Sequence, residues 1–446
     1  MRYHTHRRIG FIAFLFVAIA VSGAFASVPD PEFVAAKQSF LKEMKKKSPA
    51  ARVAAVSAFV EVVQQETAEL LLKRGFSDDD RSVRLAAQKG LRQLADDRVV
   101  AQFLLEELKK SLRKPSLNET VVVELFRALA ATEDDSRQAE VVKCLNDFLA
   151  SSRANLLIPM TVIDDFGQQG DTVAVRSVTL LAKAKAFENN FGYRRCVVQA
   201  MSQIRQPEAV GFLIGLLPKA QGLIQHDAIE YLTRLTQQKF RDNDRDWSKW
   251  WKDNQNDFKF PAAGVPLPEV TIDDQQQTYY GIPICAKRIV FVLDTSGSMR
   301  GQPIEAAKQA LLKVVESLPE AVAFDIVMFD VAASTWQPRL VPATAAAKQD
   351  AARTVTDRGL KAGTVSSAAL NAAFGLEPEA IYFLSDGEPT DGAPHQIVGY
   401  VSQMNRTRRI SIHTIGVVTQ RNGGIGLTSF MQPLSDQNYG KFRLVE

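Results

Sequence analysis

The sequence predicts a two-domain protein in which an all-helical domain is followed by an α/β domain. From Pro31 to Asp257, apolar residues recur at the spacing of amphipathic helices, and strand-like alternation is absent. Residues 258–285 are rich in proline and glutamine. From Ala286 onward, short apolar strands alternate with amphipathic helices, which is the pattern of a mostly parallel sheet with helices on both faces.

The composition is that of an ordinary globular protein. The chain has 446 residues, of which 46% are hydrophobic and 23% are charged, and this length is enough for two or three domains. Lysine and arginine outnumber aspartate and glutamate by 54 to 50, but Arg2, Arg7 and Arg8 lie in a leading segment without acidic residues. Removing these three leaves 51 basic against 50 acidic residues, so we expect no nucleic-acid partner.

Residues 1–26 are predicted to be a signal peptide. A basic start is followed by an apolar run from Ile9 to Val21 and by small residues that end at Ala26. The run is shorter than the ~20 residues of a membrane-spanning helix, which favours cleavage before Ser27, with an uncleaved anchor as the alternative. We therefore expect an exported protein, periplasmic or extracellular, with no stable membrane span after signal cleavage.

The three cysteines do not predict a disulfide framework. Cys144, Cys196 and Cys285 are far apart and odd in number, so we interpret them as small core residues. A Cys144–Cys196 bridge is the alternative. No C-x-x-C pair or Cys/His cluster indicates zinc.

The helical domain, residues 27–257, repeats itself loosely. Helix-forming segments are expected at 81–94, 121–129, 195–204 and 227–235. Each of these segments ends in an apolar residue, and Phe166 lies between the second and the third segment. Successive members of this set are about 31 to 38 residues apart, which is the period of stacked helical hairpins. The set is Leu94, Leu129, Phe166, Ile204 and Leu235. The pattern, with Asp78 to Arg84 as a repeat opening, resembles HEAT-type repeats, which implies a platform for binding partners. An irregular helical bundle is the alternative.

Three tryptophans end the helical domain. Trp247, Trp250 and Trp251 are spaced so that their rings share one helix face. This predicts a cap on the last repeat or a domain contact, and an aromatic platform for sugar or peptide is the alternative. The D-W-x-x-W-W helix is similar to one that closes helical-repeat regions in some exported bacterial proteins.

Residues 258–285 are predicted to be a Pro-rich linker, because this mixture of residues cannot build a core. In the C-terminal domain, residues 286–446, the apolar pattern predicts strands at 288–293, 323–329, 380–384, 410–417 and 441–445. It predicts helices at 303–318, 345–356, 366–374, 395–405 and 426–434.

Oxygen-bearing side chains follow the first of these strands, at the sheet edge where ligands bind in open parallel sheets. Asp294, Ser296 and Ser298 stand at alternate positions and supply one carboxylate and two hydroxyls. Thr364 precedes a helix and offers a third hydroxyl, and Asp386 follows another strand and offers a second carboxylate through water. Hard oxygen ligands of this kind suit Mg²⁺, with Mn²⁺ and Ca²⁺ as alternatives.

The five residues match the D-x-S-x-S, Thr, Asp pattern of the metal-ion-dependent adhesion site, and residues 286–446 resemble the von Willebrand factor A domain family. The resemblance implies a Rossmann-like fold in which Asp294, Ser296 and Ser298 are the first-loop metal ligands, Thr364 the second and Asp386 the third. Family members often have Gly-Gly-Thr where this chain has Ala362-Gly363-Thr364.

A metal held mainly by neutral hydroxyls keeps positive charge and an exchangeable water, so the exposed carboxylate of a protein partner can take the open position. We expect such metal-bridged binding and no enzymatic activity, because the site has no obvious base and the motifs G-x-S-x-G, H-E-x-x-H and G-x-x-x-x-G-K-[ST] are absent. The alternatives are a scaffold whose metal site is unused and a metal-dependent hydrolase.

Two further features are interpreted as structural. His413 lies within a predicted strand, which favours a satisfied structural role. The short basic runs 45–47 and 406–409 are interpreted as solvated helix ends or loops.

Overall fold

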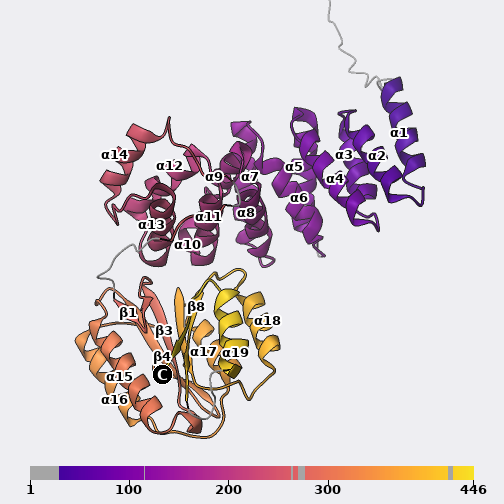
Figure 1. Cartoon of the computed structure of the whole chain (residues 1–446). Coiled ribbons are helices and arrows are strands. Elements are labelled where there is room, and N and C mark those ends of the chain that lie inside the picture. The colour runs from indigo at the N-terminus through magenta and orange to yellow at the C-terminus, as the bar shows by residue number, and fades with distance from the viewer. Residues whose placement is uncertain (1–29, 115, 263–264, 270–276, 420–424) are drawn as a thin grey trace, which may run out of the picture.

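The computed structural model describes residues 30–114, 116–262, 265–269, 277–419 and 425–446. A row of helices forms the N-terminal domain, and an α/β domain lies beneath one end of that row in Figure 1. The predicted signal peptide, residues 1–26, lies outside the described residues. None of the helices in the described part of the chain combines the length and apolarity that a bilayer crossing requires.

The prediction of an all-helical N-terminal domain is confirmed. The α-helices are α1 (Pro31–Glu43), α2 (Pro49–Val60), α3 (Gln65–Leu70), α4 (Arg81–Leu94), α5 (Arg98–Arg113), α6 (Glu119–Ala130), α7 (Asp135–Leu149), α8 (Leu157–Gln169), α9 (Thr172–Leu181), α10 (Lys185–Asn189), α11 (Phe191–Gln203), α12 (Pro207–Leu216), α13 (Gly222–Thr236) and α14 (Asp244–Asn254). Short π-helical and 3₁₀ turns continue α3 and α12, namely η1 (Leu71–Gly75) and η2 (Leu217–Lys219).

Side-chain caps explain where many of these helices begin. Asp80, Asp97, Asp134 and Asn243 each accept a hydrogen bond from a backbone N–H in the first turn of the helix that follows. Such a cap satisfies N–H groups that have no partner within the helix and contributes about 1 kcal/mol. Each of these helices therefore begins at a residue that the sequence specifies locally.

The helices stack in two rows. One row is formed by α2, α4, α6, α8, α11 and α13, and the other by α3, α5, α7, α9, α12 and α14. The predicted repeat anchors are all buried in the core that the rows share; they are Leu94, Leu129, Phe166, Ile204 and Leu235. Because the helices of one row are parallel, their amino ends lie along one edge of the domain and their carboxyl ends along the opposite edge.

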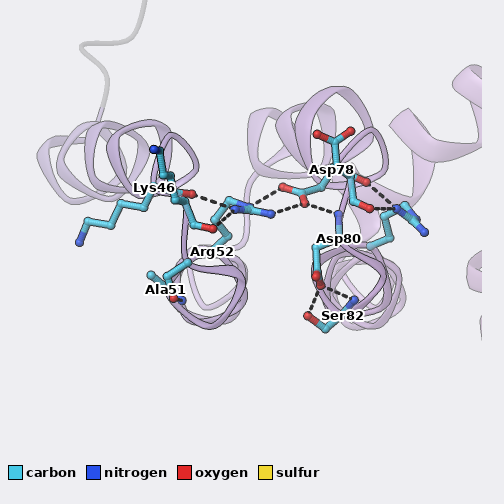
Figure 2. A network of polar contacts seen from close by, with 10 residues as sticks. Lys46, Ala51, Arg52, Asp78, Asp80 and Ser82 are labelled. Carbon is cyan, nitrogen blue, oxygen red and sulfur yellow. Dashed lines mark hydrogen bonds and ion pairs between the residues drawn. The ribbon is translucent and has the colours of Figure 1, made fainter.

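Arginine side chains join neighbouring hairpins at the amino-end edge (Figure 2). The Arg52 guanidinium donates to both carboxylate oxygens of Asp78, at 2.8 and 2.9 Å, and its Nη1 donates to the carbonyl of Lys46 at 2.8 Å. Arg84, one repeat later, donates to the Asp78 carbonyl at 2.7 Å, and Asp80 caps α4. These contacts hold the loops of successive hairpins together.

The tryptophan cluster is a cap. Trp247 and Trp251 are buried, and Phe258 packs edge-on against Trp251 and the half-buried Trp250, with ring centroids 5.5 and 6.0 Å apart. The indole Nε1 of Trp247 donates to the Arg241 carbonyl at 2.9 Å. The cap interpretation is confirmed. The platform interpretation is wrong for Trp247 and Trp251, because their rings are inaccessible to a ligand.

The C-terminal domain is a mostly parallel sheet with helices on both faces, as predicted. Its strands are β3 (Arg288–Asp294), β4 (Ala323–Phe329), β5 (Ala333–Thr335), β6 (Val341–Pro342), β7 (Ala380–Ser385), β8 (Ser411–Val417) and β9 (Phe442–Val445). The order is β5-β4-β3-β7-β8-β9. Only the short edge strands β5 and β6, which were not predicted, run antiparallel to β4.

Five helices cover this sheet. They are α15 (Gln302–Ser317), α16 (Ala345–Asp357), α17 (Ser366–Gly375), α18 (Pro394–Asn405) and α19 (Ile425–Asp436). α15 and α16 pack on one face, and α17, α18 and α19 pack on the other (Figure 1). Side chains of β3 alternate between the two cores: Phe291 faces the first and Val292 the second.

The segment between the domains contains a small hairpin, β1 (Thr278–Tyr279) and β2 (Ile282–Pro283). Tyr279 is buried in the core of the C-terminal domain beside Phe291, within the stretch 258–285 whose composition predicts a linker. Upstream of this hairpin, Arg205 donates to the Pro261 carbonyl at 2.8 Å, so this part of the segment is held on the helical domain.

None of the three cysteines forms a disulfide. Cys196 is fully buried, as expected for a core residue. Cys144 and Cys285 are only half-buried, so the core interpretation is wrong for these two, which pack at the margins of the cores.

The helical domain contacts the sheet at the amino ends of its strands. The Glu379 carboxylate, just before β7, accepts hydrogen bonds from Lys287 N at 2.9 Å and from Leu223 N at 3.5 Å. Glu379 thereby joins the start of β3 to the start of α13. At Gly192 the two backbones are so close that a Cβ would lie 2.0 Å from the carbonyl oxygen of Thr407.

Arg409 forms a largely buried charged contact between the domains. It is 8% exposed and donates to Gln199 Oε1 at 2.8 Å and to the carboxylate of Asp164. Arg195 donates to the Arg409 carbonyl. The interpretation of run 406–409 as solvated is therefore wrong for Arg409, because its acidic partner comes from the other domain.

His413 has the structural role that was predicted. Its Nδ1 accepts a hydrogen bond from Lys441 N at 3.1 Å, and its ring stacks on Tyr382 with centroids 4.7 Å apart. Burial lowers the pKa of His413 to about 3, and the nearby charge of Arg195 acts in the same direction. The folded protein therefore holds this imidazole in its neutral form.

We expect His413 to make the protein sensitive to acid. The unfolded chain takes up this proton near pH 6.5 and the folded chain only near pH 3, so the contribution of His413 to stability is lost as the pH falls through that window, by at most about 5 kcal/mol. Urea unfolding between pH 7 and 4 measures the loss, and it should be smaller in His413→Gln, which keeps an acceptor. An identical pH dependence in both proteins would contradict the assignment.

Candidate functional site

The predicted site residues lie on three loops at the carboxyl ends of the strands. Asp294 is the last residue of β3, and Ser296 and Ser298 stand in the turn that follows. Asp386 comes directly after β7, which pairs with β3 in parallel register. Thr364 lies in the loop between α16 and α17. The fold thus brings residues from three parts of the sequence to one edge of the sheet.

Hydrogen bonds link four of these residues in a continuous chain. Asp294 Oδ1 accepts from Ser296 N at 2.8 Å, and the Ser296 and Ser298 hydroxyl oxygens are 2.9 Å apart. The Ser298 hydroxyl donates to Asp386 Oδ1 at 2.7 Å. The two carboxylates are therefore connected through the backbone N–H of Ser296 and the hydroxyls of Ser296 and Ser298.

Thr364 reaches the same place from the neighbouring loop. Its Oγ1 lies 3.9 Å from the position that a Cβ on Gly387 would occupy, immediately after Asp386. Its backbone is fixed by Thr390, whose Oγ1 accepts from Thr364 N at 3.0 Å and whose N donates to the Thr364 carbonyl at 2.9 Å. All five predicted site residues are thus gathered together.

The glycine before Thr364 is required by the backbone. Gly363 has φ +86°, and a Cβ there would meet Val331 Cγ1 at 3.1 Å. Both the positive φ and the close contact disfavour any other residue. The replacement of the first glycine of the family pattern by Ala362 leaves this requirement satisfied.

The site is buried and carries negative charge. Asp294 and Asp386 are 0% and 2% exposed, whereas Ser298 is half-buried. Burial raises the pKa of Asp294 to about 6; hydrogen bonds from Ser385 and Ser296 oppose that rise, and the charge of Asp386 adds to it. A buried carboxylate of this kind is stabilised by a cation.

The donor set consists of oxygens. Within the described residues, no group of three or more His, Cys, Asp or Glu side chains is arranged to hold a metal ion, so a metal here would depend on hydroxyls as well as carboxylates. Two carboxylates and three hydroxyls are ligands of the type that Mg²⁺ and Ca²⁺ accept.

Several supporting residues were not predicted. The Ser385 hydroxyl donates to Asp294 Oδ2 at 2.5 Å and fixes the orientation of that carboxylate. Arg358 binds the buried Asp330 at 2.8 Å, and the Asp330 carbonyl accepts from Val365 N at 3.0 Å. Ser385 could have been predicted from the sequence, because it directly precedes Asp386. The Arg358–Asp330 pair could not, because no motif near either residue indicates that they meet.

Comparison with known proteins finds relatives of the C-terminal domain. Residues 287–440 match the family model of the von Willebrand factor type A domain. Inter-alpha-trypsin inhibitor heavy chain H1 of Mesocricetus auratus is 39% identical over 120 residues, and heavy chain H4 of Bos taurus is 36% identical over 119 residues. Each match covers 24% of this chain and 13% of the relative, so it spans a small part of those longer proteins.

Solved structures of similar domains include a von Willebrand factor type A protein from Catenulispora acidiphila. It has a TM-score of 0.33 and 19% identity and covers 37% of this chain and 40% of that one. An aerotolerance-related membrane protein from Bacteroides fragilis has a TM-score of 0.28 and 18% identity and covers 35% of this chain and 90% of that one. The family match and the sheet topology together show that residues 287–440 form an α/β domain like that of von Willebrand factor type A.

We expect Asp294→Asn to stabilise the metal-free protein at neutral pH. Because the pKa of Asp294 is raised from 3.8 to about 6, its ionisation costs stability as the pH rises through that window, by about 3 kcal/mol above pH 6. Urea unfolding in EDTA from pH 4 to 8 should show the variant gaining relative to the unmodified protein across this range. The exposed Glu388→Gln is the control and should change nothing. A variant that is less stable at every pH would contradict the argument.

Proposed function

We propose that the C-terminal domain binds a divalent cation, Mg²⁺ in the first place, and uses it to engage the carboxylate of a protein partner. The observation that carries this proposal is the convergence of two buried carboxylates and three hydroxyls at the carboxyl end of the sheet. Asp294, Ser296, Ser298, Thr364 and Asp386 would hold the ion.

The spacing of the hydroxyl oxygens supports a small ion. Neighbouring ligands of an octahedral Mg²⁺ site lie about 3 Å apart, because each is about 2.1 Å from the ion and adjacent bonds are at right angles. The hydroxyl oxygens of Ser296 and Ser298 are 2.9 Å apart. The side chains are therefore close to ligand spacing without rearrangement.

The charge balance favours an additional carboxylate ligand. With Asp294 bound directly and Asp386 through water, one negative charge in direct contact faces the two positive charges of the ion, and the remaining direct ligands are neutral hydroxyls. An incoming carboxylate would fill the open coordination position and neutralise the remaining positive charge. The bound ion would supply electrostatic attraction, and the protein side chains would hold it in position.

The position of the site supports binding to a second protein. The helical domain occupies the amino ends of the strands, so it leaves the carboxyl ends uncovered. Von Willebrand factor A domains are typically interaction domains. The stacked helices would serve as a further platform, and the predicted signal peptide would place the protein in the periplasm or outside the cell.

We expect metal binding to depend on Asp294, Ser298 and Thr364. Mg²⁺ at millimolar concentration should raise the unfolding temperature of the unmodified protein. It should have no effect on Asp294→Ala and a reduced effect on Ser298→Ala and Thr364→Ala, because each loses a ligand. Titration calorimetry with Mg²⁺, Mn²⁺ and Ca²⁺ ranks the ions. Glu388→Gln is the control, and an unchanged shift in Asp294→Ala would rule out the site.

Partner capture tests the second half of the proposal. Residues 27–446 are immobilised and exposed to envelope and culture-medium fractions of the source cells in Mg²⁺ or in EDTA, beside Asp294→Ala. We expect a protein that is retained only by the unmodified chain in Mg²⁺. Retention that ignores both EDTA and the substitution would support a scaffold in which the helices bind. Turnover of phosphoester or peptide substrates that requires Mg²⁺ would support a hydrolase.

A further inference from the structure

A groove opens on the helical domain at the edge where α4 meets α5, α6 meets α7, and α8 meets α9. It has a volume of about 800 Å³ and continues into a second hollow of about 640 Å³ between α5 and α7. Arg98, Asp134 and Arg137 line both hollows, so the two form one extended channel. This is the carboxyl-end edge of the row α4, α6 and α8, opposite the edge that contacts the C-terminal domain.

Positive charge predominates in the larger of the two hollows. The 800 Å³ hollow is lined by five cationic side chains and three acidic ones; the cations are Lys89, Arg92, Arg98, Arg137 and Arg176, and the acids are Asp96, Glu133 and Asp134. Glu133 is bound by Arg176, and Asp134 caps α7. Lys89 and Arg98 are exposed at the rim. The larger hollow therefore has spare positive charge. In the smaller hollow Glu106 and Glu140 are also present, and both are bound by Lys109.

Three guanidinium groups in the channel have unused hydrogen-bonding capacity. Arg137 is 8% exposed, and its Nη1 donates to Thr132 Oγ1 at 2.9 Å, but its ion-pair contact with Asp134 is a loose 4.0 Å. The Nε of Arg176 is buried and has no hydrogen-bond partner in the described part of the chain. Arg92 is partly buried, and its contact with Glu124 is 3.4 Å long.

A buried guanidinium with unsatisfied donors costs free energy, and a bidentate anion such as a carboxylate recovers it. Burial also lowers the pKa of Arg92. The arrangement of donors in the channel therefore favours an anionic ligand.

Apolar side chains in the channel narrow the choice of ligand. Val99 is 64% exposed, and Phe103, one helical turn further along α5, is half-buried beside it. Val173 lines the other hollow. A nucleic acid or a sulfated polysaccharide would leave these surfaces unused, whereas a peptide can place apolar side chains on them between its carboxylates.

We infer that this channel is a docking site for an extended acidic peptide segment of a protein partner, with apolar side chains interspersed among its carboxylates. This docking site is separate from the candidate metal site, because the channel lies on the helical domain. It lies at the edge of that domain that faces away from the C-terminal domain. Binding here needs no metal. The protein would thus engage two partners, or two parts of one partner, at the same time.

A fluorescence-anisotropy titration tests this inference with residues 27–446 and a labelled peptide of alternating glutamate and leucine. The test variant is Lys89→Glu combined with Arg98→Glu, both exposed, so that folding is preserved. The matched control is Lys45→Glu combined with Lys47→Glu, which makes the same change of charge at the opposite edge of the domain. We expect about tenfold weaker binding for the test variant and less than about twofold for the control.

Arg137→Lys provides a second variant, which keeps the buried charge but removes the planar fork. We expect severalfold weaker peptide binding, with urea unfolding measured in parallel to verify that the variant is folded. Peptide binding should persist for the unmodified chain in EDTA, and it should also persist for the Asp294→Ala variant. Both results are expected whether or not the metal proposal holds.

Four results would overturn the inference. They are unchanged affinity in the test variant, equal weakening in the control variant, loss of binding in EDTA, and equally tight binding of a glutamate–serine peptide or a sulfated polysaccharide. The last result would assign the channel to polyanions in general.

Discussion

The parallel pairing of β3 with both β4 and β7 is the constraint on which the C-terminal domain depends. β3 is buried from Ile289 to Asp294 and supplies side chains to both cores. Because its partners run in the same direction, Asp294 and Asp386 arrive at one edge, while Glu379 at the other edge joins β3 and β7 to the helical domain. One arrangement of strands thus separates the candidate metal site from the domain contact.

Charged contacts extend this order into the helical domain. In the row of parallel helices, Arg92 contacts Glu124 of the next hairpin, and Arg195 binds Asp227 in the same way at 2.7 Å. Arg409 supplies a similar contact from the other domain, since its guanidinium forms an ion pair with the carboxylate of Asp164 in α8. Removing one member of the mostly buried Arg195–Asp227 pair leaves an uncompensated charge and costs about 3–5 kcal/mol, so this contact helps to fix the register of neighbouring hairpins.

The extent to which the sequence predicts this structure depends on the length of each signal. Long periodic segments such as α4 were predicted to the residue, and the D-x-S-x-S motif located Asp294, Ser296 and Ser298 because a short loop places them together. β5 and β6 have three and two residues, too few for a period to be seen. Arg409 was misinterpreted because its partner Asp164 is 245 residues away, and only the assembled domains bring the two together.

Cys196 is buried where the two domains meet. Its sulfur lies 3.5 Å from Arg409 Nη2, so a side chain of the C-terminal domain covers a thiol of the helical domain. Burial also raises the pKa of this thiol well above its usual value, which suppresses the reactive thiolate. Cys144 and Cys285 are nearer the surface and belong to different domains. Cys196 therefore lies in an environment that both domains build, within the core of the helical domain and against Arg409 of the other domain.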